Sequence, residues 1–508
     1  MCTHRNPLGV SFCSVEQRMR LGRPICTVLF TVACLCLLQG TNAVGQTFKI
    51  TDLGTLGGNN SYATAISDGQ VVGDSETGRT DTNGNPLIHA FSWTQAGGMV
   101  DLGTLGGDFS SVRAVSNGQV VGQAATGTTN TDGTPLFHAF IWTLAGGMVD
   151  LGTLGGGVST ATAISNGQVV GVAATGSTNT DRTPVLHAFI WTLAGGMVDL
   201  GTLGGLNSYA IAISNGQVVG WAEIGSANTD GSRVSHAFIW TLAGGMVDLG
   251  TLGGEHSHAT AISNGQVVGS AATGSVDSDG KRVAHAFSWT QFAGMVDLGT
   301  LGGEFSHATA VSNGQVVGSA ATTTLGSHAF SWTQAGGMLD LGTLGGDFSS
   351  VRAVSNGQVV GRAGTGSVDT YGAQVEHAFS WSGAGGMVDL GALDGFAHST
   401  AVALSNGLVA GHAYNIDPDF GDPSEGRAVL WTQLTTWTPT PRPTRTPTPS
   451  PTRTATATIT PTPAATSDPN DGGGGGCAIT MDNRPGVPRG VVALLAPLAL
   501  FLWWRGRR

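Results

Sequence analysis

Residues 150–198 read DLGTLGGGVSTATAISNGQVVGVAATGSTNTDRTPVLHAFIWTLAGGMV, and near-copies of this stretch fill most of the chain. Each copy opens with Asp-Leu-Gly, at Asp52, Asp101, Asp150, Asp199, Asp248, Asp297, Asp340 and Asp389. Successive aspartates lie 49 residues apart, except for a step of 43 between Asp297 and Asp340. Self-similarity at a fixed period in this range is typical of a repeat architecture.

One repeat has the pattern of four short β-strands. Residues 159–165 alternate small polar and apolar side chains, as a half-buried strand does. Asn166-Gly167 follows and predicts a two-residue hairpin, because both turn residues need a positive φ. Residues 168–175 and 187–192 are the next expected strands, and a Gly-rich turn leads into a fourth at 197–198. No stretch of the repeat has helical periodicity.

Copy six indicates which part of the repeat is a loop. It is shorter than the other copies, and the missing residues lie between Gly318 and His328. A segment that is lost while its flanks persist is expected to be a surface loop.

These units predict an all-β fold, a β-propeller of about eight four-stranded repeats. A single small sheet buries too little apolar surface, whereas stacked neighbours share a core of Ile, Val, Phe and Trp. The repeat region begins with a strand of the Asp-Leu-Gly type at 48–54 and ends with one of the His-Ala-Phe type at 427–431. These types are partners at every internal junction, so the two ends are expected to pair and close a ring. The alternative is an open β-solenoid with end caps.

The chain divides into four segments. Residues 1–45 form a predicted secretory signal peptide, in which arginines precede an apolar run at 25–38 and small residues follow. Residues 46–434 hold the repeats. Residues 435–476 are rich in Thr, Pro and then Gly, and predict a disordered, extended stalk. Residues 477–508 contain an apolar run at 491–504 and terminal arginines, which predict a C-terminal apolar helix that anchors the protein in a membrane.

The leader also bears on the start codon and on disulfides. Residues 1–18 are unlike a normal start of a signal peptide, and we hypothesise that translation begins at Met19 rather than Met1. N-terminal sequencing of a precursor that starts at Met1 would contradict this. Five of the six cysteines lie in the leader, so Cys477 alone remains after cleavage and no intramolecular disulfide is expected.

The charge balance excludes one class of partner. The chain has 22 basic and 33 acidic residues, a net charge of −11. Nucleic-acid binding needs a basic surface, so no nucleic-acid partner is expected.

The repeat motif, with His-Ala-Phe at 89–91, 138–140, 187–189, 236–238, 285–287, 328–330 and 377–379, resembles the bacterial HAF-family probable extracellular repeat. The resemblance covers about residues 48–431 and implies an exported or surface protein without an established activity. The C-terminus is similar to a bacterial tripartite envelope-sorting signal. This implies a sorting protease as a partner and Cys477 as the residue that is processed or carries a lipid. The alternative is a plain tail anchor with an incidental cysteine.

The recurring histidines have a structural interpretation. WD-repeat propellers use His, Ser or Thr, Trp and Asp in one hydrogen-bond network per blade, and Asp150, Ser165, His187 and Trp191 recur here with similar types. A group present in every blade is explained by what every blade needs. The alternative is a ring of imidazoles that binds a metal or a substrate.

Two sets of residues are weak metal candidates. Asp277 and Asp279, in an Asp-Ser-Asp-Gly loop, faintly resemble a calcium loop, but the closing Glu is missing and such sequences are ordinary turns. The second set lies at one equivalent loop in copies five and six and offers zinc ligands: Glu255, His256, His258, Glu304 and His307. A solvated loop is the preferred interpretation of this set, so no cofactor is assigned.

The sequence contains no nucleophile motif, phosphate loop or zinc-protease signature, and no catalytic residue is assigned. The expected function is therefore a non-enzymatic binding or adhesion surface for a glycan or protein, displayed outside the cell on a stalk. Many near-equivalent weak sites suit multivalent attachment. The alternatives are a propeller hydrolase or lyase on extracellular polymers and a passive structural surface protein.

Overall fold

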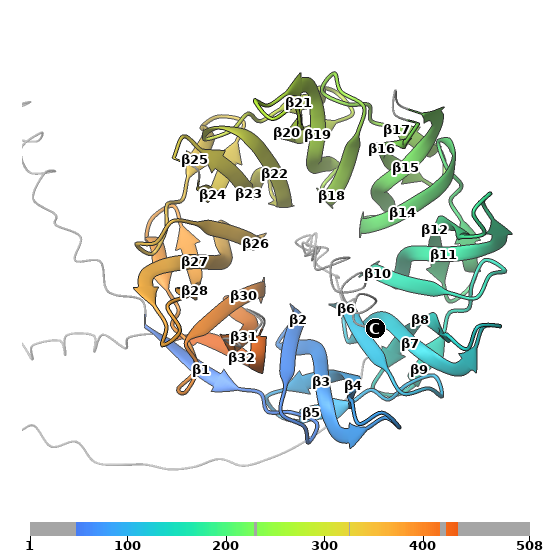
Figure 1. Ribbon diagram of the computed structural model, residues 1–508, viewed down its shortest axis with the longest axis horizontal. Helices are drawn as coiled ribbons and strands as arrows, with labels where there is room; N and C mark the ends of the chain where they lie inside the picture. Colours follow the sequence, from blue (N-terminus) through green and yellow to red (C-terminus); the bar gives the residue numbers. More distant parts are fainter. Residues whose placement is uncertain (1–46, 228–230, 325, 417–422, 435–508) are drawn as a thin grey trace, which may run out of the picture. The chain divides into compact units, whose positions relative to one another are not determined.

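The computed structural model describes residues 47–227, 231–324, 326–416 and 423–434. These residues form eight four-stranded antiparallel sheets, arranged as blades around a central axis (Figure 1). The predicted all-β propeller is confirmed, and the open solenoid is wrong. The predicted segments 1–45, 435–476 and 477–508, with Cys477, lie outside the described residues. Within the described ranges no helix is long and apolar enough to cross a membrane.

The strands of a blade follow the chain from the axis outward, and blades are numbered one to eight in chain order. The first, innermost strands are β2 (Ser61–Ser67), β6 (Ser110–Ser116), β10 (Ser159–Ser165), β14 (Gly204–Ser214), β18 (Ser257–Ser263), β22 (Gly302–Ser312), β26 (Ser349–Ser355) and β30 (His398–Ser405). The second strands are β3 (Gln70–Thr80), β7 (Gln119–Thr129), β11 (Gln168–Thr178), β15 (Gln217–Ala227), β19 (Gln266–Val276), β23 (Gln315–Thr322), β27 (Gln358–Val368) and β31 (Leu408–Ile416).

The third strands are β4 (Pro86–Thr94), β8 (Pro135–Thr143), β12 (Pro184–Thr192), β16 (Arg233–Thr241), β20 (Arg282–Thr290), β24 (Ser327–Thr333), β28 (Gln374–Ser382) and β32 (Pro423–Gln433). The outer strands are β5 (Gly98–Asp101), β9 (Gly147–Asp150), β13 (Gly196–Asp199), β17 (Gly245–Asp248), β21 (Gly294–Asp297), β25 (Gly337–Asp340), β29 (Gly386–Asp389) and, for blade eight, β1 (Phe48–Asp52).

The two ends of the repeat region close the ring. β1 pairs antiparallel with β32, from Phe48 opposite Gln433 to Asp52 opposite Val429. The first strand in the sequence therefore completes the last blade, as the end motifs predicted. The backbone N–H of Leu53 donates to the carbonyl of Ala428 at 2.9 Å and continues this pairing past the end of β1.

The hairpin chemistry agrees with the sequence pattern. Asn166 and Gly167 have φ of 51° and 76°, and they join β10 to β11 as expected. β10 has the predicted bounds, whereas β11 and β12 extend further than predicted into the hairpin between them. Thr178 and Pro184 still pair there, although residues nearby are exposed. Backbone hydrogen bonds therefore extend these strands beyond the residues whose apolar pattern predicted them.

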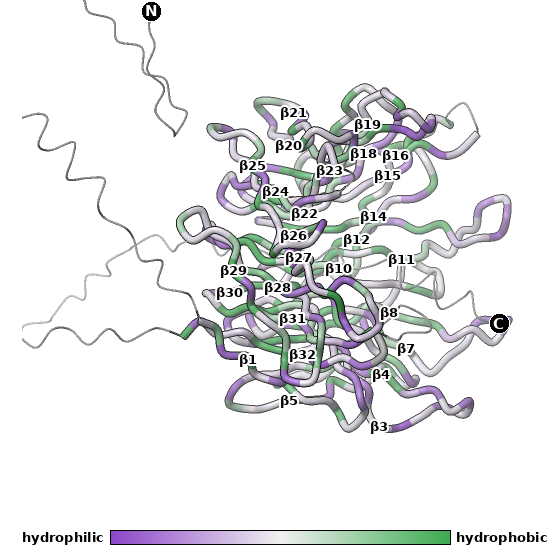
Figure 2. The backbone as a smooth tube through the Cα atoms, turned by 60° about the vertical axis from the view of Figure 1, so that its left-hand side comes forward, coloured by the Kyte–Doolittle hydropathy of each residue, from purple (hydrophilic) through white to green (hydrophobic). Residues whose placement is uncertain are grey.

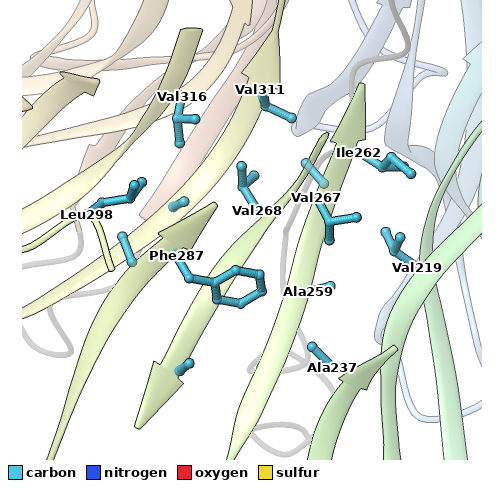
Figure 3. Close-up of a cluster of buried hydrophobic side chains, with 14 of the residues drawn as sticks. Val219, Ala237, Ala259, Ile262, Val267, Val268, Phe287, Leu298, Val311 and Val316 are labelled. Atoms are coloured by element: carbon cyan, nitrogen blue, oxygen red, sulfur yellow. The ribbon is translucent and has the colours of Figure 1, made fainter. Parts of the chain in front are cut away.

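The core lies between blades rather than within one. In the cluster of Figure 3, Val219 and Ala237 of blade four pack with Ile262, Val267 and Phe287 of blade five. Val268, on the other face of blade five, belongs with the residues of blade six in the same cluster. Every blade thus needs a neighbour on both faces.

The ring has two distinguishable faces. Because adjacent strands are antiparallel, the second-to-third-strand hairpins lie at the same end as the loops that lead from an outer strand into the next blade. We call this end the upper face. In Figure 2 the hairpins beside β3 and β11 extend from one side of the ring and carry hydrophilic residues. The Asn-Gly hairpins lie at the opposite, lower face.

The shortened copy six changes the upper face locally. Its second-to-third-strand hairpin is tightened, with the N–H of Thr322 donating to the carbonyl of Gly326 at 2.9 Å. The predicted variable loop is confirmed at this place. A cavity of about 340 Å³ lies on one side of this hairpin, between blades five and six, and one of about 420 Å³ lies on the other side, beside Asp347.

Gly171 of β11 tests the blade geometry. It sits beside the irregularity in the pairing of β10 with β11, and a Cβ at this position would lie 2.0 Å from the carbonyl oxygen of Thr160 and 2.9 Å from the Phe189 ring. We expect Gly171→Ala to lower the free energy of unfolding by about 1–3 kcal/mol, as overpacking does. Gly383→Ala is the matched control, since its nearest neighbour would be 3.9 Å away. Equal urea-unfolding midpoints for both variants would contradict this packing.

Candidate functional site

The recurring His and Asp residues form a hydrogen-bond network at seven of the eight blade junctions, and Arg427 replaces the His at the closure of the ring. His138 Nδ1 lies 2.8 Å from Asp150 Oδ2, and Asp150 Oδ1 accepts from the N–H of Gly152 at 2.7 Å. The adjoining Ala139 N–H donates to Ser159 Oγ, which in turn donates to the carbonyl of Gly152. His138 belongs to blade two and Ser159 to blade three, so the network connects consecutive blades.

The membership of this network differs from the predicted set. His187 pairs with Asp199 at 2.7 Å, and not with Asp150, because Asp199 lies on β13 beside β12. The serine is Ser159 rather than Ser165, which sits at the lower, opposite end of β10. Trp191 packs half-buried against the apolar cluster of blades two and three. The analogy with WD repeats found the residue types but assigned them the wrong partners.

The structure gives the metal candidates other partners. His258 Nε2 lies 2.9 Å from Ser235 Oγ, and His256 Nδ1 accepts from the Ser235 N–H, so both belong to the junction of blades four and five. Glu255 pairs with Arg282 at 2.7 Å. Glu304 is exposed, and His307 lines the cavity between blades five and six. The described ranges contain no group of three or more potential metal ligands.

The acidic loop residues act as turn formers. Asp277 Oδ1 accepts from the backbone N–H groups of Asp279 and Lys281, at 2.9 and 2.8 Å. Asp81 and Asp369 make the same contacts in their own hairpins. One carboxylate oxygen in each of these hairpins therefore stabilises the turn.

Comparison of the copies reveals positions that differ within an otherwise repeated sequence. On the first strands they are Tyr62, Ser111, Thr160, Tyr209, His258, His307, Ser350 and Thr400. On the second strands they are Asp74, Gln123, Val172, Trp221, Ser270, Ser319, Arg362 and His412. In all eight blades the two residues are directly opposite each other in the sheet. We call these the variable pairs.

The variable pairs lie in crevices between blades at the upper face. Asp74 accepts from the hydroxyl of Ser111 in the next blade at 2.7 Å, and Gln123 accepts from that of Thr160 at 2.7 Å. In blade four, Trp221 stacks on Tyr209 with ring centroids 4.1 Å apart. Trp221 also approaches His258 of blade five, at 5.3 Å. These crevices are filled by contacts between the blades themselves.

The crevice between blades five and six is hollow. Its variable residue Ser270 is small, and the cavity of about 340 Å³ is lined by Ser270, Ala284, Phe305, His307, Ser319 and Ser327. Phe305 is 39% exposed. His307 is exposed toward this crevice, but the crevice walls remove part of its hydration. This desolvation, and next the charge of Arg352, lowers the pKa of His307. This hollow crevice is the candidate site.

One residue of this site, His307, was named from the sequence as a weak metal candidate, and the others were missed. The positions that all copies share located the framework. The positions at which they differ, such as Ser270 against Trp221, mark the candidate site. Only the pairing register of the first and second strands shows that these positions lie opposite each other and face a crevice.

No protein-family model matches the chain, and no curated protein matches it. Among solved structures, the chain is similar to the β-propeller domain of the Trilobed protease from Pyrococcus furiosus, at 8% identity and a TM-score of 0.42, over 66% of this chain and 97% of that one. It is also similar to puromycin hydrolase, at 15% identity and a TM-score of 0.39, over 72% and 53%. A third similarity, to the phage phi92 endosialidase, has 8% identity and a TM-score of 0.32, over 77% and 70%.

The junction serine is expected to matter for stability. Ser159→Ala would leave the Ala139 N–H and the Gly152 carbonyl without their side-chain partner, and an unsatisfied buried group costs about 1–3 kcal/mol. Ser177→Ala is the control, since Ser177 is exposed near the end of β11. Chemical unfolding of both variants measures the difference, and equal stability would refute the role of this hydroxyl.

Stability is expected to fall in mild acid. Burial, and next the neighbouring His256, lowers the pKa of His258 from 6.5 to about 4; burial, and next Arg352 and Arg362, does the same for His412. As the pH falls below 6.5, these histidines become protonated in the unfolded chain before they do so in the folded one. Their contribution to the free energy of unfolding is therefore complete above pH 6.5 and is lost as the pH falls toward 4. Each histidine contributes at most about 3 kcal/mol. Urea unfolding from pH 7 to 4 should show a flatter slope for His258→Gln/His412→Gln than for the parent, and an unchanged slope would contradict it.

Proposed function

We propose that this chain is an exported protein, held at the cell envelope, whose propeller displays a non-enzymatic binding surface for an extracellular glycan. The observation that carries the proposal is that the variable pairs differ from one upper crevice to the next, while the junction networks repeat around most of the ring. Residues that hold the framework recur, and residues that contact a ligand are free to differ. A passive spacer gives no reason for this distribution.

The hollow crevice has the composition of a sugar site. Ligand sites combine apolar surface with a few placed polar groups. Here the partly exposed ring of Phe305 offers an apolar face, and Ser270, Ser319 and Ser327 offer hydroxyl groups around it. His307 adds a group that donates or accepts. A saccharide presents the complementary surfaces, with C–H groups on one face of its ring and hydroxyl groups at the edge.

The proposed location rests on the sequence outside the described residues. The leader at 1–45 supports export, and the stalk at 435–476 would hold the propeller away from an anchor at 477–508. The resemblance to HAF-family repeats and to an envelope-sorting signal supports the same location. In this proposal the membrane and a sorting protease are partners of the C-terminus, and Cys477 is the processed or lipid-bearing residue.

A second candidate, a hydrolase or lyase acting on extracellular polymers, is favoured by one observation. The crevice of blades seven and eight has an asymmetric set of titratable groups, in which Glu376 accepts from Tyr414 at 3.1 Å and pairs with Arg362 at 2.8 Å. An enzyme needs such a single constellation rather than many equivalent ones. Release of shortened chains from a bound polymer would favour this candidate over simple binding.

The proposed site is tested by filling it. Ser270→Trp places in blade five the residue that blade four already accommodates at the same position, Trp221. We expect the propeller, residues 46–434, to bind a subset of glycans on an array, and Ser270→Trp to weaken that binding at least tenfold. The ring itself should stay intact, as measured by an unchanged thermal midpoint.

Val172→Trp is the matched control, because it makes the same substitution at the equivalent position of blade three. It should leave glycan binding unchanged. Absence of binding to every glycan, without turnover, would leave the passive spacer as the better description. Equal binding by Ser270→Trp and the parent would show that the hollow crevice is not the site.

A further inference from the structure

Blade seven concentrates positive charge at the upper face. Arg362 is the variable residue of its second strand, and Arg352 lies two residues beyond Ser350 on its first strand. The residues equivalent to Arg352 in the other blades are Thr64, Arg113, Thr162, Ile211, Thr260, Thr309 and Val402. Blade seven alone combines arginine at both positions, in a chain whose net charge is −11.

The nearby carboxylate balances only one of the two charges. Arg362 Nη1 lies 2.8 Å from Glu376 Oε2, and the guanidinium lies 5.7 Å from the centre of the Phe348 ring. These two contacts hold Arg362 in place. Arg352 is half-buried and takes part in no ion pair in the described part of the chain.

The same crevice contains polar atoms without partners. Three buried side-chain atoms of the described residues in blades seven and eight lack a hydrogen bond, and they belong to Ser350, Arg362 and His412. Arg362 Nε and Ser350 Oγ are donors, and His412 Nδ1 donates in one tautomer. Leaving such groups unpaired is costly, and oxygens of an anion would satisfy them.

Blade seven, which carries both arginines, follows blade six, which contributes Phe305 and His307 to the proposed sugar site (Figure 1). A chain of sugar rings that lies along the upper face from blade five to blade eight would therefore meet Phe305 and the serine hydroxyls first and the arginines next. Burial, and next the charge of Arg352, lowers the pKa of both His307 and His412, which agrees with this placement.

We infer that the ligand is an anionic saccharide, with a sugar ring in the hollow crevice and a carboxylate or sulfate group bound by Arg352 and Arg362. This rests on the proposed function and assigns its ligand class. Guanidinium groups bind such anions through two parallel hydrogen bonds, which gives both charge neutralisation and orientation. Glu376 and Tyr414 hold Arg362 in position for this contact.

Calorimetry with the full-length chain tests the inference, using tetragalacturonic acid, its methyl ester and a sulfated galactan tetrasaccharide as probes. We expect an anionic probe to bind at least tenfold more tightly than the uncharged ester, with an advantage that shrinks as salt is raised. Tighter binding of the uronate would identify the anion as a carboxylate, and tighter binding of the galactan would identify it as a sulfate.

Arg352→Gln should remove the advantage of the anionic probe, and Arg352→Lys should restore part of it. Arg113→Gln, the equivalent change in blade two, should have no effect. Loss of the advantage in Arg352→Gln without a change in binding of the ester would exclude a general disruption of the fold. If the ester binds as well as the anions and Ser270→Trp still abolishes binding, the inference is wrong and the proposed function stands. Absence of binding by all three probes, with no hit on the glycan array, would overturn both.

Discussion

The structure depends on one constraint: each blade is a thin sheet with two apolar faces, and only neighbouring blades cover them. Val170 and Ile190 of blade three pack with Ile213 and Phe238 of blade four, and equivalent clusters recur around the ring. At the closure, Phe91 of blade one packs with Leu430 of blade eight. Because apolar burial is the main favourable term in folding, an open chain would leave one face at each end in water. The pairing of β1 with β32 removes those ends.

The hydrogen bonds of the junction networks are directional, unlike the apolar packing, and so fix how one blade sits against the next. The hydroxyl of Ser159 joins a backbone N–H of blade two to a backbone carbonyl of the loop that enters blade three. The Asp150 carboxylate fixes both that loop and His138. These groups set the position of each blade on the next. The copies diverge at the variable pairs of the first and second strands, which contribute different contacts from one crevice to the next.

Much of the framework could be predicted from the sequence because it depends on residues close together in the chain. Asn166-Gly167 predicted a hairpin from the need for positive φ, and the shortened copy six located the variable loop. The closure of the ring followed from the types of the two end strands.

The partners in the network could not be predicted in the same way. Whether His187 meets Asp150 or Asp199 depends on which strands are neighbours, and the strand order places Asp199 on the adjacent β13. The candidate site is also non-local, since Ser270 faces Phe305 and His307 only when blade six lies beside blade five. The side-chain size that hollows this crevice, serine in place of tryptophan, is visible in the sequence. Its consequence is visible only in the structure.

Closure of the ring is tested most directly by a cross-link between its first and last strands. Lys49 and Thr432 are opposite each other in the pairing of β1 with β32. In a full-length chain whose six natural cysteines are replaced by serine, Lys49→Cys/Thr432→Cys should form a cross-link with a short thiol reagent, identified by mass spectrometry of the joined peptides. Lys49→Cys/Thr192→Cys, with the second cysteine at the equivalent position of blade three, should not form one. Equal, low cross-linking in both variants would show that the ring is open.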